Sequence, residues 1–211
     1  MKKGYFVTGT DTGIGKTFAS CALLHAFSAS GKSAAGMKCV SAGGDDAQRL
    51  VRASSFQVPE RLANPYPLKT PASPHIAAGI EGIGIETEKI AKAYGEIRSE
   101  VVIVEGVGGF HVPLNERELV CDLASLLSLP VIVVVGMRLG CISHALLTFA
   151  AIERCGLRVA GWIANRIDPE MRYFDENIAF LSGRQGAPLL GILPHGVTPP
   201  EAAPFLDLSR L

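Results

Sequence analysis

The sequence carries no surplus of charge of either sign. Lys plus Arg and Asp plus Glu both number 20, so the formal net charge at pH 7 is zero. Proteins that bind nucleic acid or an anionic membrane by electrostatics usually have a basic surplus. The balance argues against both kinds of partner.

A long hydrophobic run is also missing. The longest one, which ends at Val135, is far shorter than the roughly 20 residues that cross a bilayer as a helix. Residues 1–3 lead directly into an apolar stretch, which leaves no room for a signal peptide. The five cysteines are an odd number without a Cys-x-x-Cys pair, so we expect reduced thiols in a cytoplasmic protein.

Signatures of metal sites and hydrolases are absent as well. The five histidines show no spacing typical of a metal site, and no Ser-His-Asp or Cys-His arrangement is indicated. No repeat or low-complexity segment is evident. With 48% apolar and 19% charged residues, we expect a single compact domain over residues 1–211.

The most informative feature that is present is the stretch YFVTGTDTGIGKT at residues 5–17. A short apolar strand, a glycine-rich loop and a Gly-Lys-Thr that opens a helix together form a phosphate cradle. Backbone N–H groups and the positive end of the helix dipole point at the anion. Lys16 is placed to reach the outer phosphates of a nucleoside triphosphate, and the Thr17 hydroxyl to bind its Mg²⁺.

This loop departs from the standard motif by one position. Thr10 stands where the first glycine is expected, and Gly9 precedes it. The alternative is a glycine turn before an ordinary helix, with Lys16 in solvent. Gly-Lys-Thr between a strand and a helix favours the phosphate site.

Strands and helices are predicted to alternate along the chain. Residues 101–104, 131–135 and 159–164 are apolar without alternation, which is typical of strands buried on both faces. The pattern predicts an α/β fold: a single P-loop NTPase-like domain with a mostly parallel sheet and helices on both faces. Residues 40–46 are expected to form a glycine loop. Residues 57–74, with five of the 13 prolines, are expected to be irregular.

Three polar residues close predicted strands, where ligands bind in such folds. Glu105 can bind Mg²⁺ or cap a helix. Lys38 can offset charge on a transferred phosphoryl group or remain a surface charge. Asn165 can pair with the edge of an adenine or form a turn.

At two predicted helix starts, the polar groups can either cap the helix or bind a ligand. Asp46, considered alone, is best explained as an N-cap. The backbone N–H groups at residues 140–143 suit a carboxylate, but Ser143 can also serve there as a simple N-cap.

Several stretches, taken in order, resemble the dethiobiotin synthetase family and cover nearly the whole chain. The most specific are the GTDT-x-x-GKT form and VEGVGG at residues 104–109. The others are MKCV, DA, NPY, SPHI, LPVIVVVG, LGCISHALLT, GWIAN and APLLGILP.

The resemblance implies an ATP- and Mg²⁺-dependent ligase of biotin biosynthesis. In that reaction 7,8-diaminononanoate takes up CO₂ on one amine to give a carbamate. ATP converts the carbamate to a carbamic-phosphoric mixed anhydride, and the second amine closes the cyclic urea. Two anions must meet, so lysines and Mg²⁺ are needed to offset their repulsion.

The resemblance also assigns residue roles. Lys38 and Lys16 would be catalytic, and the metal ligands would be Thr17, Asp46 and Glu105. The ATP site would comprise Gly13, Ile14, Gly15, Lys16, Thr17, Phe18, Asp46, Glu105, Asn165, Arg166, Pro194, His195, Gly196 and Glu201. The substrate site would comprise Thr12, Lys38, Ser41, Ala42, Gly140, Cys141 and Ser143, the last three contributed across a homodimer interface.

Some positions depart from the family pattern. Ala42 stands where a hydroxyl residue is usual, Ser143 where asparagine is common, and Gly13 where an acidic residue is frequent. A partitioning-type ATPase is an alternative, but such proteins carry a second lysine early in the loop, where this chain has Asp11. A regulatory nucleotide-binding module is another. A cobyrinate-amidation relative would need a glutaminase domain that 211 residues do not accommodate.

Overall fold

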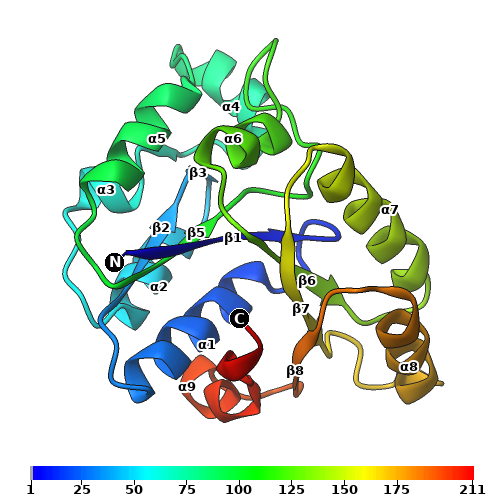
Figure 1. The fold of residues 1–211 in the computed structure, drawn as a ribbon. Coiled ribbons are helices and arrows are strands. Elements are labelled where there is room, and N and C mark those ends of the chain that lie inside the picture. The colour runs from blue at the N-terminus through cyan, green and yellow to red at the C-terminus, as the bar shows by residue number, and fades with distance from the viewer. Residues whose placement is uncertain (1) are drawn as a thin grey trace.

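The computed structural model describes residues 2–211 and is built around a six-stranded parallel sheet (Figure 1). The strand order is β2-β5-β1-β6-β7-β8. Their bounds are β1 (Lys3–Gly9), β2 (Ala34–Lys38), β5 (Val101–Glu105), β6 (Val131–Gly136), β7 (Val159–Asn165) and β8 (Leu189–Leu193). The predicted α/β fold with a parallel sheet is confirmed.

Helices cover both faces of this sheet (Figure 1). One face carries α1 (Lys16–Ala29), α2 (Asp46–Ala53) and α9 (Pro199–Ala202). The other carries α3 (Glu60–Ala63), α4 (Pro74–Glu81), α5 (Thr87–Glu96), α6 (Val120–Leu127), α7 (Cys141–Arg154) and α8 (Phe174–Arg184). The 3₁₀ helices η1 (Ala203–Phe205) and η2 (Leu208–Arg210) follow. Within residues 2–211, no helix combines the length and apolarity needed to cross a bilayer.

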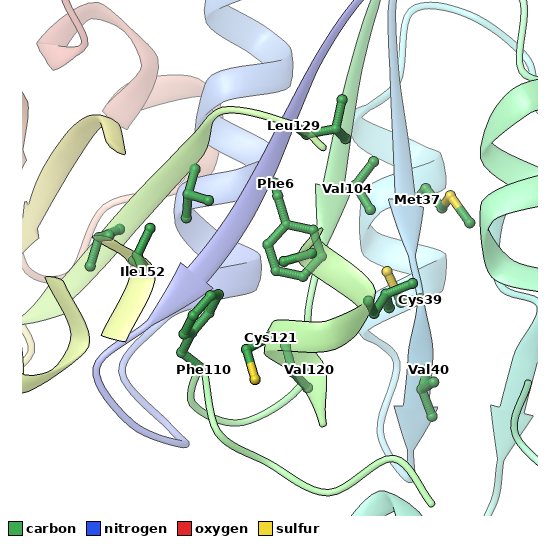
Figure 2. Packing of buried hydrophobic residues seen from close by; sticks show 14 of the residues in the cluster. Phe6, Met37, Cys39, Val40, Val104, Phe110, Val120, Cys121, Leu129 and Ile152 are labelled. Atoms are coloured by element: carbon green, nitrogen blue, oxygen red, sulfur yellow. The ribbon is translucent and has the colours of Figure 1, made fainter. Parts of the chain in front are cut away.

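The two covered faces explain why the central strands are apolar throughout. In β5, Val101 and Ile103 pack toward α1, whereas Val102 and Val104 pack toward the opposite helices. Figure 2 shows the buried cluster on the face opposite α1, to which Phe6 of β1 and Val120 at the start of α6 both belong. Burying a side chain of this size stabilises the fold by about 1.5–3 kcal/mol.

The phosphate-binding loop lies at the middle of the sheet. β1 has β5 on one side and β6 on the other: after β1 the chain goes to the edge strand β2, returns to β5, and then adds β6, β7 and β8 on the opposite side of β1. Ligands of doubly wound sheets bind where the strand order reverses in this way. The topology therefore places residues 10–17 at the switch point.

A second, two-stranded sheet corrects two expectations. β3 (Val40–Ala42) pairs in parallel with β4 (Tyr66–Leu68), inside segments predicted as a glycine loop and as irregular structure. Those predictions were wrong for these residues and for α3. Each strand is only three residues long, and the two are far apart in the sequence, so no local pattern predicted them.

Candidate active site

A cavity of about 660 Å³ opens beside the phosphate-binding loop. It brings together residues from the loop, the start of α1 and the ends of β2, β3 and β5. Ten residues predicted for the site line it: Thr12, Gly13, Gly15, Lys16, Thr17, Phe18, Lys38, Ala42, Asp46 and Glu105.

A network of charges forms the floor of this cavity. Lys38 Nζ donates to Glu105 Oε1 at 2.6 Å and to Asp46 Oδ2 at 2.9 Å. The Thr17 hydroxyl donates to the same Glu105 oxygen at 2.7 Å. Lys38 and Glu105 are register partners on β2 and β5, so their side chains point to the same face, the one covered by α1 and α2.

The structure does not agree with the simpler explanations of Lys38 as a surface charge and of Asp46 and Ser143 as N-caps. Lys38 is only 3% exposed and is no surface charge. The N-cap of α2 is Asp45, and Asp46 instead begins the helix with its side chain on Lys38. The N-cap of α7 is Gly140, so Ser143 lies inside the first turn.

Lys38 is held as an ammonium ion. Burial opposes its charge, but the adjacent Glu105 and Asp46 carboxylates outweigh that effect and raise the pKa of Lys38 above its usual value. The pKa of Asp46 is lowered, because the charge and hydrogen bond of Lys38 outweigh partial burial. Lys38 can therefore stabilise negative charge, but it is poorly suited to accept a proton.

Lys16 is in a different electrostatic state. Its Nζ donates to the carbonyl oxygen of Asp11 at 2.8 Å, and no carboxylate of residues 2–211 lies within 4 Å of it. Burial, followed by the nearby charge of Lys38, lowers the pKa of Lys16 to about 8. A bound phosphate would supply the anion that this buried ammonium lacks.

The predicted metal residues fit a magnesium ion. Glu105 is fully buried, and its Oε2 finds no hydrogen-bond partner in the described part of the chain. Thr17 and Asp46 add oxygens at the same place, and Mg²⁺ binds oxygen ligands. No three His, Cys, Asp or Glu side chains converge within residues 2–211. Mg²⁺ typically keeps waters and substrate phosphates as ligands beside one or two protein carboxylates.

Two glycines permit the close packing of the loop. Gly15 has a φ of 84°, and a Cβ there would overlap the Asn165 carboxamide. A Cβ on Gly9 would lie 2.9 Å from Cγ of Lys16. The displaced first glycine thus makes room for the lysine stem.

Asn165 is buried beneath the loop rather than forming a turn. Its Nδ2 donates to the carbonyl oxygen of Ile14 at 2.7 Å, and the residue is 5% exposed. Ile14 is also buried, so its side chain supports the loop from below. Asn165 does not line the cavity, and its predicted contact with an adenine stays a prediction.

The other residues predicted near the base lie at the ends of β7 and β8. Asn165 and Leu193 are register partners, so the segment of Arg166 and the segment of Pro194, His195 and Gly196 begin at the same edge. His195 Nδ1 lies 3.2 Å from the Arg166 carbonyl oxygen. Glu201 accepts from the backbone N–H and the hydroxyl of Thr198 at the start of α9.

Four predicted substrate residues lie outside the cavity of their own chain. Gly140 and Ser143 are exposed at the start of α7, and Cys141 is buried between them. Ser41 is buried, and its hydroxyl accepts from Asn64 Nδ2 at 2.8 Å.

Sequence reasoning missed two cations at this end of the sheet. Arg49 lines the cavity one helical turn after Asp46, and that spacing on a predicted helix was the available signal. Arg138 binds Asp11 Oδ2 at 2.7 Å and so ties the segment before α7 to the phosphate-binding loop. No local pattern predicted that pair, because its members are 127 residues apart.

A family model and two named relatives match nearly the whole chain. The family model described as an AAA domain matches residues 3–198. Two relatives are named ATP-dependent dethiobiotin synthetase BioD. The one from Aromatoleum aromaticum is 54% identical and covers 98% of this chain and 97% of its own length. The one from Nitrosospira multiformis is 50% identical, with 100% and 97% covered.

Solved structures support the fold at much lower identity. The septum site-determining protein MinD from Pyrococcus horikoshii, complexed with Mg-ADP, is similar with a TM-score of 0.60 at 13% identity. It covers 98% of this chain and 91% of its own. The cell division protein FtsY from Thermotoga maritima gives a TM-score of 0.59 at 16% identity, covering 98% and 69%. These likenesses concern the fold alone.

Proposed function

The chain belongs to the family of ATP-dependent dethiobiotin synthetases, ligases of biotin biosynthesis, and from this premise we propose how its residues carry out the reaction. The substrates are 7,8-diaminononanoate, CO₂ and ATP. The supporting observation is that Lys16, Thr17, Lys38, Asp46 and Glu105 line one cavity.

The proposed reaction has three bond-forming steps. One amine of the substrate attacks CO₂, loses a proton and becomes a carbamate. A carbamate oxygen then attacks the γ-phosphorus of ATP; the bond to the bridging oxygen breaks, and ADP leaves. The second amine attacks the carbonyl carbon of the mixed anhydride and loses a proton, and phosphate departs as the urea ring closes.

The two lysines act mainly on charge. Carbamate and triphosphate repel each other, and a fixed cation between them lowers the energy of their approach. The ammonium of Lys38, at the end of β2, is held by two carboxylates, Glu105 at the end of β5 and Asp46 at the start of α2, so it needs little reorganisation. Lys16 would exchange the Asp11 carbonyl for phosphate oxygens, whose negative charge favours its ammonium form.

Thr17, Asp46 and Glu105 would hold Mg²⁺ when it is bound. The ion supplies positive charge next to the outer phosphates. The unpaired Oε2 of buried Glu105 supports this assignment.

We further propose that two copies of the chain complete the substrate site. The start of α7 lies outside its own cavity, yet its N–H groups suit a carboxylate. Apolar side chains surround it on the surface: Leu139 is 96% exposed and Leu147 is 69% exposed. A second subunit would cover them and bring its own Gly140, Cys141 and Ser143 to the diamine's carboxylate.

Binding of the base is proposed for the ends of β7 and β8. Asn165 and Arg166 follow one strand, and Pro194, His195 and Gly196 follow its neighbour, with Glu201 on the next helix. The free thiols fit the cytoplasmic location that we propose for this enzyme.

A coupled assay of ADP release tests the proposal. We expect ADP release to require both the diamine and bicarbonate, and a cyclic urea product of matching amount. ATP turnover indifferent to the diamine would contradict the synthetase chemistry.

A further inference from the structure

Arg49 is a cation on the cavity wall that the proposed reaction has not yet used. It lies on α2, is half-buried, and lines the cavity together with Lys16, Thr17 and Lys38. Within residues 2–211, no carboxylate comes within 4 Å of its guanidinium, and its side chain makes no hydrogen bond. Arg52, one turn later on the same helix, is instead two-thirds exposed and paired with Asp45.

The position of Arg49 indicates which part of the nucleotide it can reach. Helix α2 packs against α1 and β2, on the side of the loop that holds Lys38 and Glu105. β7 and β8 lie on the opposite side of β1 in the sheet. In P-loop sites the Lys and Thr of the motif contact the outer phosphates and Mg²⁺, so the α2 side is the phosphate side.

The pairing of charges in the cavity also indicates that a cation other than Lys38 is free to bind phosphate. Lys38 is bound to Glu105 and Asp46, whereas Lys16 and Arg49, the other cations that line the cavity, have no carboxylate partner among residues 2–211. An arginine keeps its charge at any working pH, and its planar fork can hold two oxygens of one phosphoryl group.

We propose that Arg49 binds the γ-phosphoryl group of ATP and stabilises the charge on it during transfer. This inference rests on the proposed function, because it takes the anion in the cavity to be the terminal phosphate. It adds to Lys16 and Lys38 a third cation, supplied by α2. The competing explanation is that Arg49 only supports Asp46, whose pKa its charge helps to lower.

Binding of two nucleotides in the presence of Mg²⁺ and without the diamine separates these explanations. Titration calorimetry would compare ADP with the β,γ-imido analogue of ATP for Arg49→Ala, Arg49→Gln and Arg49→Lys. Loss of a charged hydrogen bond to the γ-phosphate should weaken the analogue about tenfold for Ala and Gln, and less for Lys. ADP affinity should change by less than about threefold.

Arg52→Ala is the matched control, since it removes a cation from the same helix outside the cavity. Equal losses for ADP and the analogue in Arg49→Ala, or none for either, would overturn the proposal. So would a loss in Arg52→Ala as large as in Arg49→Ala. The wild-type requirement for diamine does not enter this comparison, so the two proposals can fail separately.

Discussion

The phosphate end of the site and the start of α7 are built in opposite ways. At the phosphate end, Lys38, Glu105 and Thr17 are buried and bonded to one another within one chain. At the start of α7, Gly140 and Ser143 are exposed, and Leu139 beside them is almost fully so.

The difference shows which part of the chemistry a single chain can prepare. Phosphoryl transfer needs charges fixed before the substrate arrives, and burial at strand ends fixes them. The carboxylate cradle that we propose at the start of α7 can stay open until another surface covers it. The Asp11–Arg138 ion pair links these two regions, and because its side chains are 43% and 44% exposed it is worth little by itself.

The largest expected effect follows from removing the fixed cation at the phosphate end. Lys38→Ala should lower kcat by about a thousandfold and change KM for ATP much less, because the charge acts mostly in the transition state. Steady-state kinetics measure both. Lys92→Ala, exposed on α5, is the control. An unchanged rate would remove Lys38 from the catalytic residues.

Stability should distinguish the buried network from the exposed link. Glu105→Gln leaves the Lys38 charge with a single partner and should cost about 3–5 kcal/mol of unfolding free energy. Asp11→Asn breaks an ion pair whose members are 43% and 44% exposed and should cost less than about 1 kcal/mol. Urea unfolding measures both values, and similar losses would contradict the contrast.

Lys16 should make stability depend on pH. Its pKa falls from 10.5 in the unfolded chain to about 8, so above pH 8 the unfolded state binds more protons and stability rises with pH. Lys16→Met removes this dependence. Its stability relative to wild type should therefore fall by about 2 kcal/mol between pH 7 and 9.5.

Ligand-free protein must be used, because bound phosphate would raise the Lys16 pKa again. A stability difference between wild type and Lys16→Met that stays constant across this range would show that Lys16 is not perturbed in this way. Lys92→Met provides the exposed comparison.

The smallest expected effect concerns the open end. Leu147→Lys places a charge on the exposed apolar surface of α7 and should dissociate the proposed dimer, raising KM for the diamine about tenfold. Light scattering and kinetics test this, while MgATP affinity should change little. Ile80→Lys, on α4, is the matched control. A variant that stays dimeric with unchanged KM would contradict a role for this surface.

Local sequence alone predicted the features whose parts lie close together in the chain. Lys16 and Thr17 were assigned because the strand, loop and helix around them are contiguous. The parallel sheet followed from apolar runs such as residues 131–135. On local grounds Glu105 was favoured as a metal ligand, Asp46 as an N-cap and Lys38 was open, and only the family resemblance brought the three into one site.

Tertiary structure decided how those residues act, because their partners are distant in the sequence. Lys38 meets Glu105 across 67 residues, and Thr17 meets it across 88. The pairing of β3 with β4 and the place of Arg49 in the cavity wall also depend on contacts that no local pattern encodes. The hydrophobic periodicity of a segment indicates which of its faces is buried. Which charged side chains pair depends on how distant strands and helices align in the folded chain.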